Sequence, residues 1–380
     1  MTTVEARPAR DGRERLEDLL IVDCDVHVHE SPAALAPYCD EPWRKSLETA
    51  SQIQERYLDI PGLSGGGTGL TGPVFPTGGA ELRVVETPAA MRAELSALHV
   101  DIGVLFPDHL LKLPLVVPHE YAAALARAYN AWLVAEWCRP ADGLLGCLVA
   151  CPQDPEDTAR EIERYSDHDG VVGVYLPCAA VEPLWGHRRY DPIYRAAQEA
   201  GFPVLLHSVT VVYPVFPANI HGFETGFALH SVGHTFAIMA NLVSLIETAV
   251  PVRFPELKVV ATEAWITWVP FLCYRLDKEY IERRAELPLL KERPSSYLKR
   301  FYYATQPIEE PERLADMVSI VDLYDGQDTT VFASDWPHHD FDHPRKLAQM
   351  PFAPETRRKI FGGNALTLFN IDATGKRLRR

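Results

Sequence analysis

Three side chains that can act as acids, bases or metal ligands are spaced two residues apart near the start of the chain. Asp25, His27 and His29 lie in residues 21–29, where apolar and polar residues alternate as they do in a β-strand. Side chains two residues apart in a strand point to the same side. Because imidazole is a common ligand of zinc and its neighbours, His27 and His29 predict a divalent metal site. A polar strand with two solvated histidines is the structural alternative.

The rest of the chain alternates strand-like and helix-like segments, and this alternation predicts how such residues are positioned. Eight apolar segments are predicted strands, and each is followed by helical spacing; they are residues 21–29, 100–107, 143–150, 171–177, 202–208, 257–263, 299–306 and 329–335. Continuous apolar strands are typical of parallel strands buried on both faces. We therefore expect a (β/α)₈ TIM barrel with long βα loops. A doubly wound open sheet is the alternative, but no glycine-rich dinucleotide motif follows a predicted strand.

In a TIM barrel the carboxyl ends of the strands meet at one mouth, where active sites lie. The last polar residues of the first, fifth, sixth and eighth predicted strands are His27, His29, His207, Glu263 and Asp335. Nitrogen and oxygen ligands that leave one position open for water or substrate make a catalytic metal site. The alternative is that His207 and Asp335 only cap their strands.

At this point the chain resembles a known family. The pattern D-x-H-x-H on the first strand, a histidine on the fifth and S-D-W-P-H on the eighth are similar to the amidohydrolase superfamily. Within it, the phrases RFPELKVVATE and RRKIFGGNALTLF resemble the amidohydrolase-related group that includes aminocarboxymuconate semialdehyde decarboxylase. The resemblance implies one divalent ion, with zinc expected and manganese as the alternative. The ligands it implies are His27, His29, His207 and Asp335.

Glu263 departs from this pattern, because the decarboxylases of that group carry a histidine at the end of the sixth strand. A buried glutamate can act as a general base, whereas beside a metal it stays ionised or becomes a ligand. This departure favours a hydrolase, in which metal-activated water attacks a C–N or C–O bond of a small organic substrate, an aromatic acid being one candidate. Asp335 and Glu263 are then the expected catalytic residues.

Two other functions stay open. One is metal-dependent, non-oxidative decarboxylation of an aromatic or muconate-like carboxylic acid by the same site. The other is a non-catalytic barrel with a structural metal or none.

Four further residues follow the predicted strands closely enough to contact a substrate. They are His338, His234, Trp265 and Trp336, and the tryptophans suit an aromatic substrate. A solvated loop position for His338 and a helix-capping role for His234 are the alternatives.

The composition of the 380 residues narrows the class of protein. A net charge of −15 argues against nucleic-acid binding, and no apolar run is expected to approach the roughly 18 residues of a membrane span. The charged segment 1–20 is unlike a secretory signal and is expected to be a leader or arm. Seven cysteines without a C-x-x-C pair suggest reduced thiols in a cytoplasmic enzyme.

Three segments complete the expected organisation around a single barrel domain at residues 21–371. Residues 61–80 are rich in glycine and are expected to form a mobile lid. Residues 208–234 carry many apolar side chains, which suggests a homodimer interface nearby. Residues 372–380 form a basic C-terminal tail.

Overall fold

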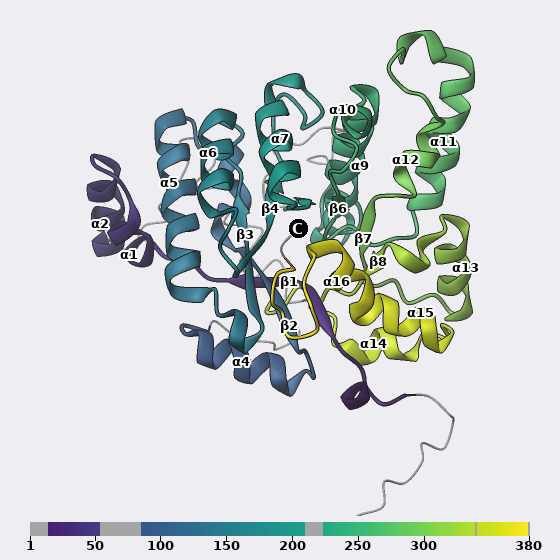
Figure 1. The fold of residues 1–380 in the computed structure, drawn as a ribbon, viewed down its shortest axis with the longest axis horizontal. Helices are drawn as coiled ribbons and strands as arrows, with labels where there is room; N and C mark the ends of the chain where they lie inside the picture. Colours follow the sequence, from purple (N-terminus) through teal and green to yellow (C-terminus); the bar gives the residue numbers. More distant parts are fainter. Residues whose placement is uncertain (1–13, 54–84, 210–222, 339, 379–380) are drawn as a thin grey trace, which may run out of the picture.

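The computed structural model describes residues 14–53, 85–209, 223–338 and 340–378. Within them, eight parallel strands pair in chain order from β1 to β8, with helices around them (Figure 1). The strands are β1 Val22–Val28, β2 Ile102–Pro107, β3 Leu144–Val149, β4 Val171–Pro177, β5 Val204–His207, β6 Val259–Ala261, β7 Tyr302–Ala304 and β8 Thr330–Val331. Every strand residue is buried, as the apolar segments predicted. The (β/α)₈ barrel is confirmed.

Helices follow the strands and pack on the outside of the barrel. The α-helices are α1 Pro32–Leu35, α2 Trp43–Ile53, α4 Pro88–Ala97, α5 His119–Trp132, α6 Pro155–Tyr165, α7 Asp191–Ala200, α8 Gly226–His230, α9 Gly233–Glu247, α10 Val250–Arg253, α11 Val269–Arg283, α12 Pro294–Leu298, α13 Ala315–Leu323, α14 Pro344–Gln349, α15 Pro354–Arg358 and α16 Asn364–Phe369. Side-chain caps begin several of them: Thr87 accepts from the Ala90 amide at α4, and Asp154 accepts from the Asp157 amide at α6.

The barrel closes between its last strand and its first. Beyond the short β8, the chain continues beside β1, where the His27 amide donates to the Trp336 carbonyl at 2.8 Å. The Asp335 amide donates to the Asp25 carbonyl at 3.0 Å. These two bonds bring residues more than 300 positions apart in sequence to the same end of the barrel.

Several predicted segments fall wholly or partly outside the described residues. The glycine-rich segment 61–80 lies outside them, as do residues 1–13 of the leader and residues 210–222 of the apolar segment. Within the tail, Arg377 donates to the carbonyls of Ala200 and Ser166, next to the ends of α7 and α6. The boundaries of leader, barrel domain and tail stay predictions.

One stretch contradicts the expectation that no apolar run approaches a membrane span. Residues 227–247, in α8 and α9, are long and apolar enough by length and composition. In this window 61% of the residues are buried inside the protein, as in the core helix of a globular domain. The stretch is apolar because α9 packs on the barrel.

All seven cysteines are buried and unpaired.

Candidate metal centre and active site

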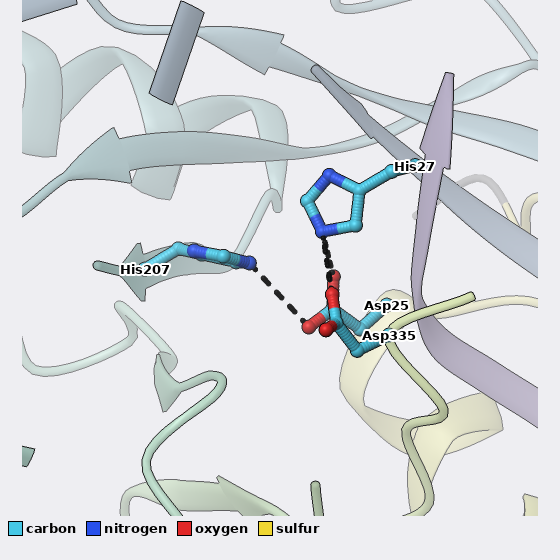
Figure 2. A group of neighbouring side chains, drawn as sticks. All are labelled: Asp25, His27, His207 and Asp335. Carbon is cyan, nitrogen blue, oxygen red and sulfur yellow. Dashed lines mark ion pairs between the residues drawn. The ribbon is translucent and has the colours of Figure 1, made fainter. Parts of the chain in front are cut away.

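Four buried side chains from three strand ends meet at the mouth of the barrel (Figure 2). Asp25 and His27 project from β1, His207 ends β5, and Asp335 follows β8. His27 Nε2 lies 3.0 Å from Asp335 Oδ1 and 3.2 Å from Asp25 Oδ1, and His207 Nε2 lies 3.5 Å from Asp25 Oδ2. One ligand atom of each residue lies within 4.8 Å of all the others.

Backbone carbonyls orient both imidazoles. His27 Nδ1 donates to the Pro107 carbonyl at 2.6 Å, and His207 Nδ1 donates to the Ser208 carbonyl at 2.8 Å. A neutral imidazole that donates from Nδ1 presents a lone pair at Nε2. Because metal-bound histidines commonly use this second contact, both rings are arranged as ligands.

The facing atoms of this group lack hydrogen bonds although they lie close together. Within the described residues, Nε2 of His27, Nε2 of His207 and both carboxylate oxygens of Asp25 are buried without a hydrogen-bond partner. Buried polar atoms are almost always satisfied, so such a cluster requires an explanation. Two nitrogen and two oxygen donors around one point fit a divalent ion, and the group is a divalent metal site.

The charges of the group also favour a cation. Burial raises the pKa of Asp25, but His207 and His27 outweigh it and hold the pKa below its usual value. Burial and His338 lower the pKa of His27, but Asp25 and Asp335 raise it to about 10. In the absence of metal, His27 therefore holds a proton that a cation must displace.

Asp335 is held by its neighbours on two sides. Its Oδ1 accepts from His338 Nδ1 at 2.7 Å, and its Oδ2 accepts from Gln306 Nε2 at 3.3 Å. His338 stacks on His27, with ring centroids 4.2 Å apart. Asp335 has a left-handed backbone, with φ of 61°, which costs about 1–2 kcal/mol in a non-glycine residue. The surrounding contacts keep its carboxylate pointed into the group.

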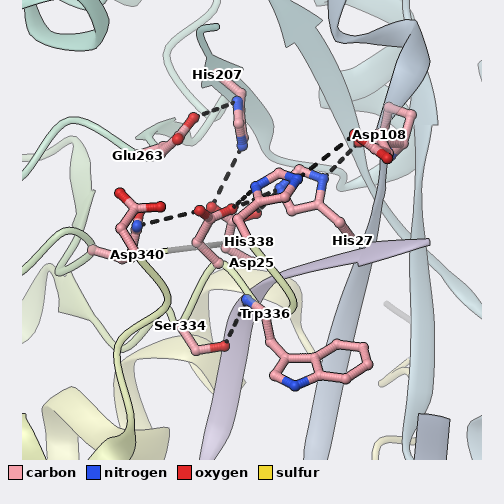
Figure 3. Close-up of polar contacts among 12 residues, drawn as sticks. Asp25, His27, Asp108, His207, Glu263, Ser334, Trp336, His338 and Asp340 are labelled. Carbon is pink, nitrogen blue, oxygen red and sulfur yellow. Dashed lines mark hydrogen bonds and ion pairs between the residues drawn. The ribbon is translucent and has the colours of Figure 1, made fainter. Parts of the chain in front are cut away.

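Glu263 lies beside this group rather than in it (Figure 3). It follows β6, and its Oε2 lies 2.9 Å from His234 Nδ1 and 3.4 Å from His207 Nδ1. Burial and the nearby Asp335 raise the pKa of Glu263 well above its usual value, while burial lowers the pKa of His234 to about 4. Both shifts favour the uncharged forms of the two facing side chains.

The structure differs from the prediction at His29. β1 ends at Val28, so the alternation of faces stops before His29. Its Nδ1 instead contacts Asp108 Oδ2 at 2.9 Å, in the segment after β2, and its side chain is 36% exposed. Asp25, which precedes His27 on the same face, takes the place expected for His29.

The two tryptophans differ in their surroundings. Trp336 is buried, its amide donates to Ser334 Oγ, and its ring extends away from the histidines and carboxylates (Figure 3). This ring belongs to the buried hydrophobic core, and its predicted substrate contact stays a prediction. Trp265 is partly buried next to Glu263, with a left-handed φ of 46° and an amide that donates to the Gln306 carbonyl at 3.3 Å.

Three residues at the mouth were given no role in the site from the sequence: Asp25, Asp108 and His109. Asp25 shares the alternating face of His27, and this signal was sufficient to include it among the ligands. Asp108 is the first polar residue after β2, so the rule of strand ends, extended to the second strand, finds it and the adjacent His109.

Sequence relatives and solved structures resemble the chain over most of its length. It is 24% identical over 262 residues to a gamma-resorcylate decarboxylase of Polaromonas sp. strain JS666, which covers 65% of this chain and 76% of that protein. An amidohydrolase structure from Mycobacterium avium subsp. paratuberculosis K-10 matches with a TM-score of 0.70 at 20% identity, covering 93% of this chain and 99% of that one.

A third similar protein is the 5-carboxyvanillate decarboxylase of Novosphingobium aromaticivorans, whose structure contains manganese and 4-hydroxy-3-methoxy-5-nitrobenzoic acid. It matches with a TM-score of 0.70 at 18% identity, covering 93% of this chain and 97% of that one.

Two of these three proteins are decarboxylases of aromatic acids, and they contradict the expectation of a hydrolase. Glu263 does not distinguish hydrolysis from decarboxylation, because a carboxyl group beside a metal centre can transfer a proton in either reaction. A family model described as amidohydrolase matches residues 22–371, which include all four residues of the metal group. The chain therefore belongs to the amidohydrolase family.

Proposed function

We propose that this protein is a metal-dependent, non-oxidative decarboxylase of a small aromatic carboxylic acid. The observation that carries the proposal is the buried group of Asp25, His27, His207 and Asp335. Within the described residues, both oxygens of Asp25 and Nε2 of each histidine lack a hydrogen-bond partner. The similarity to decarboxylases of aromatic acids supports this reaction over hydrolysis.

Asp25, His27, His207 and Asp335 would hold one divalent ion. When bound, the ion supplies a Lewis acid that binds oxygen atoms of the substrate. Mixed nitrogen and oxygen donors suit zinc and manganese, and the manganese in the 5-carboxyvanillate decarboxylase supports the second.

The reaction needs a proton source beside the bound acid. A proton adds to the ring carbon that carries the carboxylate, the bond between them breaks, and CO₂ leaves. Glu263 is the proposed donor, because it lies beside the metal group and its pKa is raised by burial and Asp335, which favours the protonated form. His234, 2.9 Å away, positions this carboxyl group. His338 and Trp265 stay proposed substrate contacts.

The direct test is an assay of CO₂ release with aromatic acids. Suitable first substrates are 2,6-dihydroxybenzoate and 5-carboxyvanillate, since similar structures are decarboxylases of these acids. We expect CO₂ and the decarboxylated arene from metal-loaded protein, and neither from chelator-treated protein. Turnover of amides, esters or lactones in place of acids would contradict the proposal.

We further propose a cytoplasmic homodimer that acts on a small molecule. The acidic chain with unpaired, buried cysteines supports the compartment. Exposed phenylalanines beside the apolar segment support the assembly: Phe227 is 84% exposed and Phe223 is 45% exposed. Light scattering at micromolar concentration should give twice the monomer mass of 42.6 kDa, and a monomeric mass would contradict the dimer.

A further inference from the structure

A second cluster of metal-ligating side chains lies next to the first group, where β1 and β2 end. His29 follows β1, and Asp108 and His109 follow β2. One ligand atom from each of these residues lies within 4.8 Å of the other two. We infer that His29, His109 and Asp108 form a second divalent-cation site at the barrel mouth.

The spacing of the two imidazoles carries this inference. His29 Nε2 and His109 Nε2 face each other at 3.4 Å, with ring centroids 4.5 Å apart and an interplanar angle of 65°. Nitrogen donors form direct hydrogen bonds at about 2.7–3.2 Å, so 3.4 Å is long for one. Two nitrogens that each lie about 2.0–2.1 Å from a tetrahedral zinc ion are about 3.3–3.4 Å apart. The two nitrogens form a long hydrogen bond, and their spacing also matches that of two ligands of one zinc ion.

Asp108 orients His29 for this role. Its Oδ2 accepts from His29 Nδ1 at 2.9 Å, which leaves the lone pair of His29 on Nε2, the atom that faces His109. A carboxylate behind a histidine is the usual support of a metal-bound imidazole. Asp108 therefore acts by orienting His29, since an oxygen bound to Nδ1 lies on the far side of the ring from Nε2.

The segment that carries Asp108 and His109 is fixed to the end of β1. Glu30 is buried, and its two carboxylate oxygens accept from the amides of Asp108 at 3.0 Å and Leu110 at 2.7 Å. Ligands held on a fixed backbone keep their spacing before an ion arrives. The His29 and Asp108 side chains are 36% and 24% exposed, so an ion can enter from solvent.

The second site is distinct from the first but is connected to it. Asp108 Oδ1 lies 3.6 Å from His338 Nε2, and the opposite ring nitrogen of His338 contacts Asp335 (Figure 3). With the two imidazoles as protein ligands, at least two positions of a tetrahedral ion stay open for water or an anionic ligand. Partial exposure and fewer ligands should make it the weaker site.

Counting bound zinc tests the inference without an activity assay. Chelator-treated protein is dialysed against buffered Zn²⁺, bound metal is measured by mass spectrometry, and affinities come from competition with a chromophoric chelator. We expect two ions per wild-type chain and one in His109→Ala. His119→Ala, at an exposed position at the start of α5, is the matched control and should keep two.

Two further variants separate the sites. His109→Gln, which retains much of the side-chain volume, should also bind one ion, and circular dichroism checks its fold. Asp335→Asn should weaken the tight site while it keeps the ion that depends on His109. One ion in both the wild type and His109→Ala, or two in both, would overturn the inference.

Discussion

At the scale of single residues, the metal group depends on atoms that the protein itself leaves unsatisfied. Removing one side chain from a buried group of charges leaves the others out of water and without a partner, which destabilises the folded protein. A bound cation instead interacts favourably with all of the carboxylates and imidazoles together. Asp25 illustrates the point, because both of its carboxylate oxygens are buried without a hydrogen bond in the described residues.

The first prediction separates Asp25 from His29 as a ligand of the tight site. Asp25→Asn removes a negative charge between His27 and His207, so the tightly bound ion should be lost or bound far more weakly. His29→Gln should keep that ion, because His29 faces Asp108 and His109. Metal content after gel filtration measures both, and the reverse pattern would restore the ligand set expected from the sequence.

The second prediction concerns the proton held by Glu263. Glu263→Gln keeps the shape of the side chain but removes the acid, so the rate should fall by roughly 10²–10⁴ while metal content stays the same. Glu161→Gln, a buried position on α6, is the matched control and should keep the rate. If Glu263→Gln lost its metal and added metal restored the rate, Glu263 would be a ligand. If the variant had a normal rate but lower stability, Glu263 would have a structural role.

At the scale of elements, a buried glutamate connects two strand ends and should make folding depend on pH. Burial and Asp108 raise the pKa of Glu30 to about 7. The folded state therefore binds the proton of Glu30 more tightly than the unfolded state does. The free energy of unfolding should fall as pH rises from about 4.5 to about 7, and Glu30 should not change it with pH outside that range.

Glu30→Gln should flatten this part of the pH dependence, measured by urea unfolding of metal-free protein. Asp23, whose pKa burial also raises to about 7, should supply the slope that remains. An unchanged slope in the variant would show that Glu30 does not titrate in this range.

The sequence predicted the elements better than their ends. Continuous apolar strands and helical spacing identified all eight strands, because these signals extend over many residues. Placing the side chains of the site required the exact end of each strand. Because β1 ends at Val28, His29 does not lie on the face that alternation assigns to it. His27, His207 and Asp335 were placed together because the barrel rule depends on strand order and not on exact ends.

Contacts from distant parts of the chain lay beyond pattern reasoning. The pairing of His234 with Glu263 and of His29 with Asp108 depends on how loops return to the mouth. No periodic pattern in the sequence predicts the path of these loops. Trp336 shows the same limit, since nothing in S-D-W-P-H indicates that its ring turns into the core.

At the scale of the whole molecule, the proposed metal ligands come from the first strand, the fifth strand and the segment after the eighth strand of the barrel. An ion that binds only the folded state stabilises it by about 2.7 kcal/mol when its free concentration is 100 times Kd. Metal should therefore raise the melting temperature of the wild type. His207→Ala should abolish that rise at the same metal concentration, and an equal rise in the variant would place the ion elsewhere.

The central claim is that this barrel releases CO₂ from an aromatic acid with the help of a divalent ion. The most direct measurement is turnover in ¹⁸O-labelled water by chelator-treated protein and by the same protein after metal is restored, with organic products analysed by mass spectrometry. The account predicts metal-dependent formation of an arene that carries no oxygen from the labelled water. A labelled organic product formed without loss of CO₂, or full activity in metal-free protein, would contradict it.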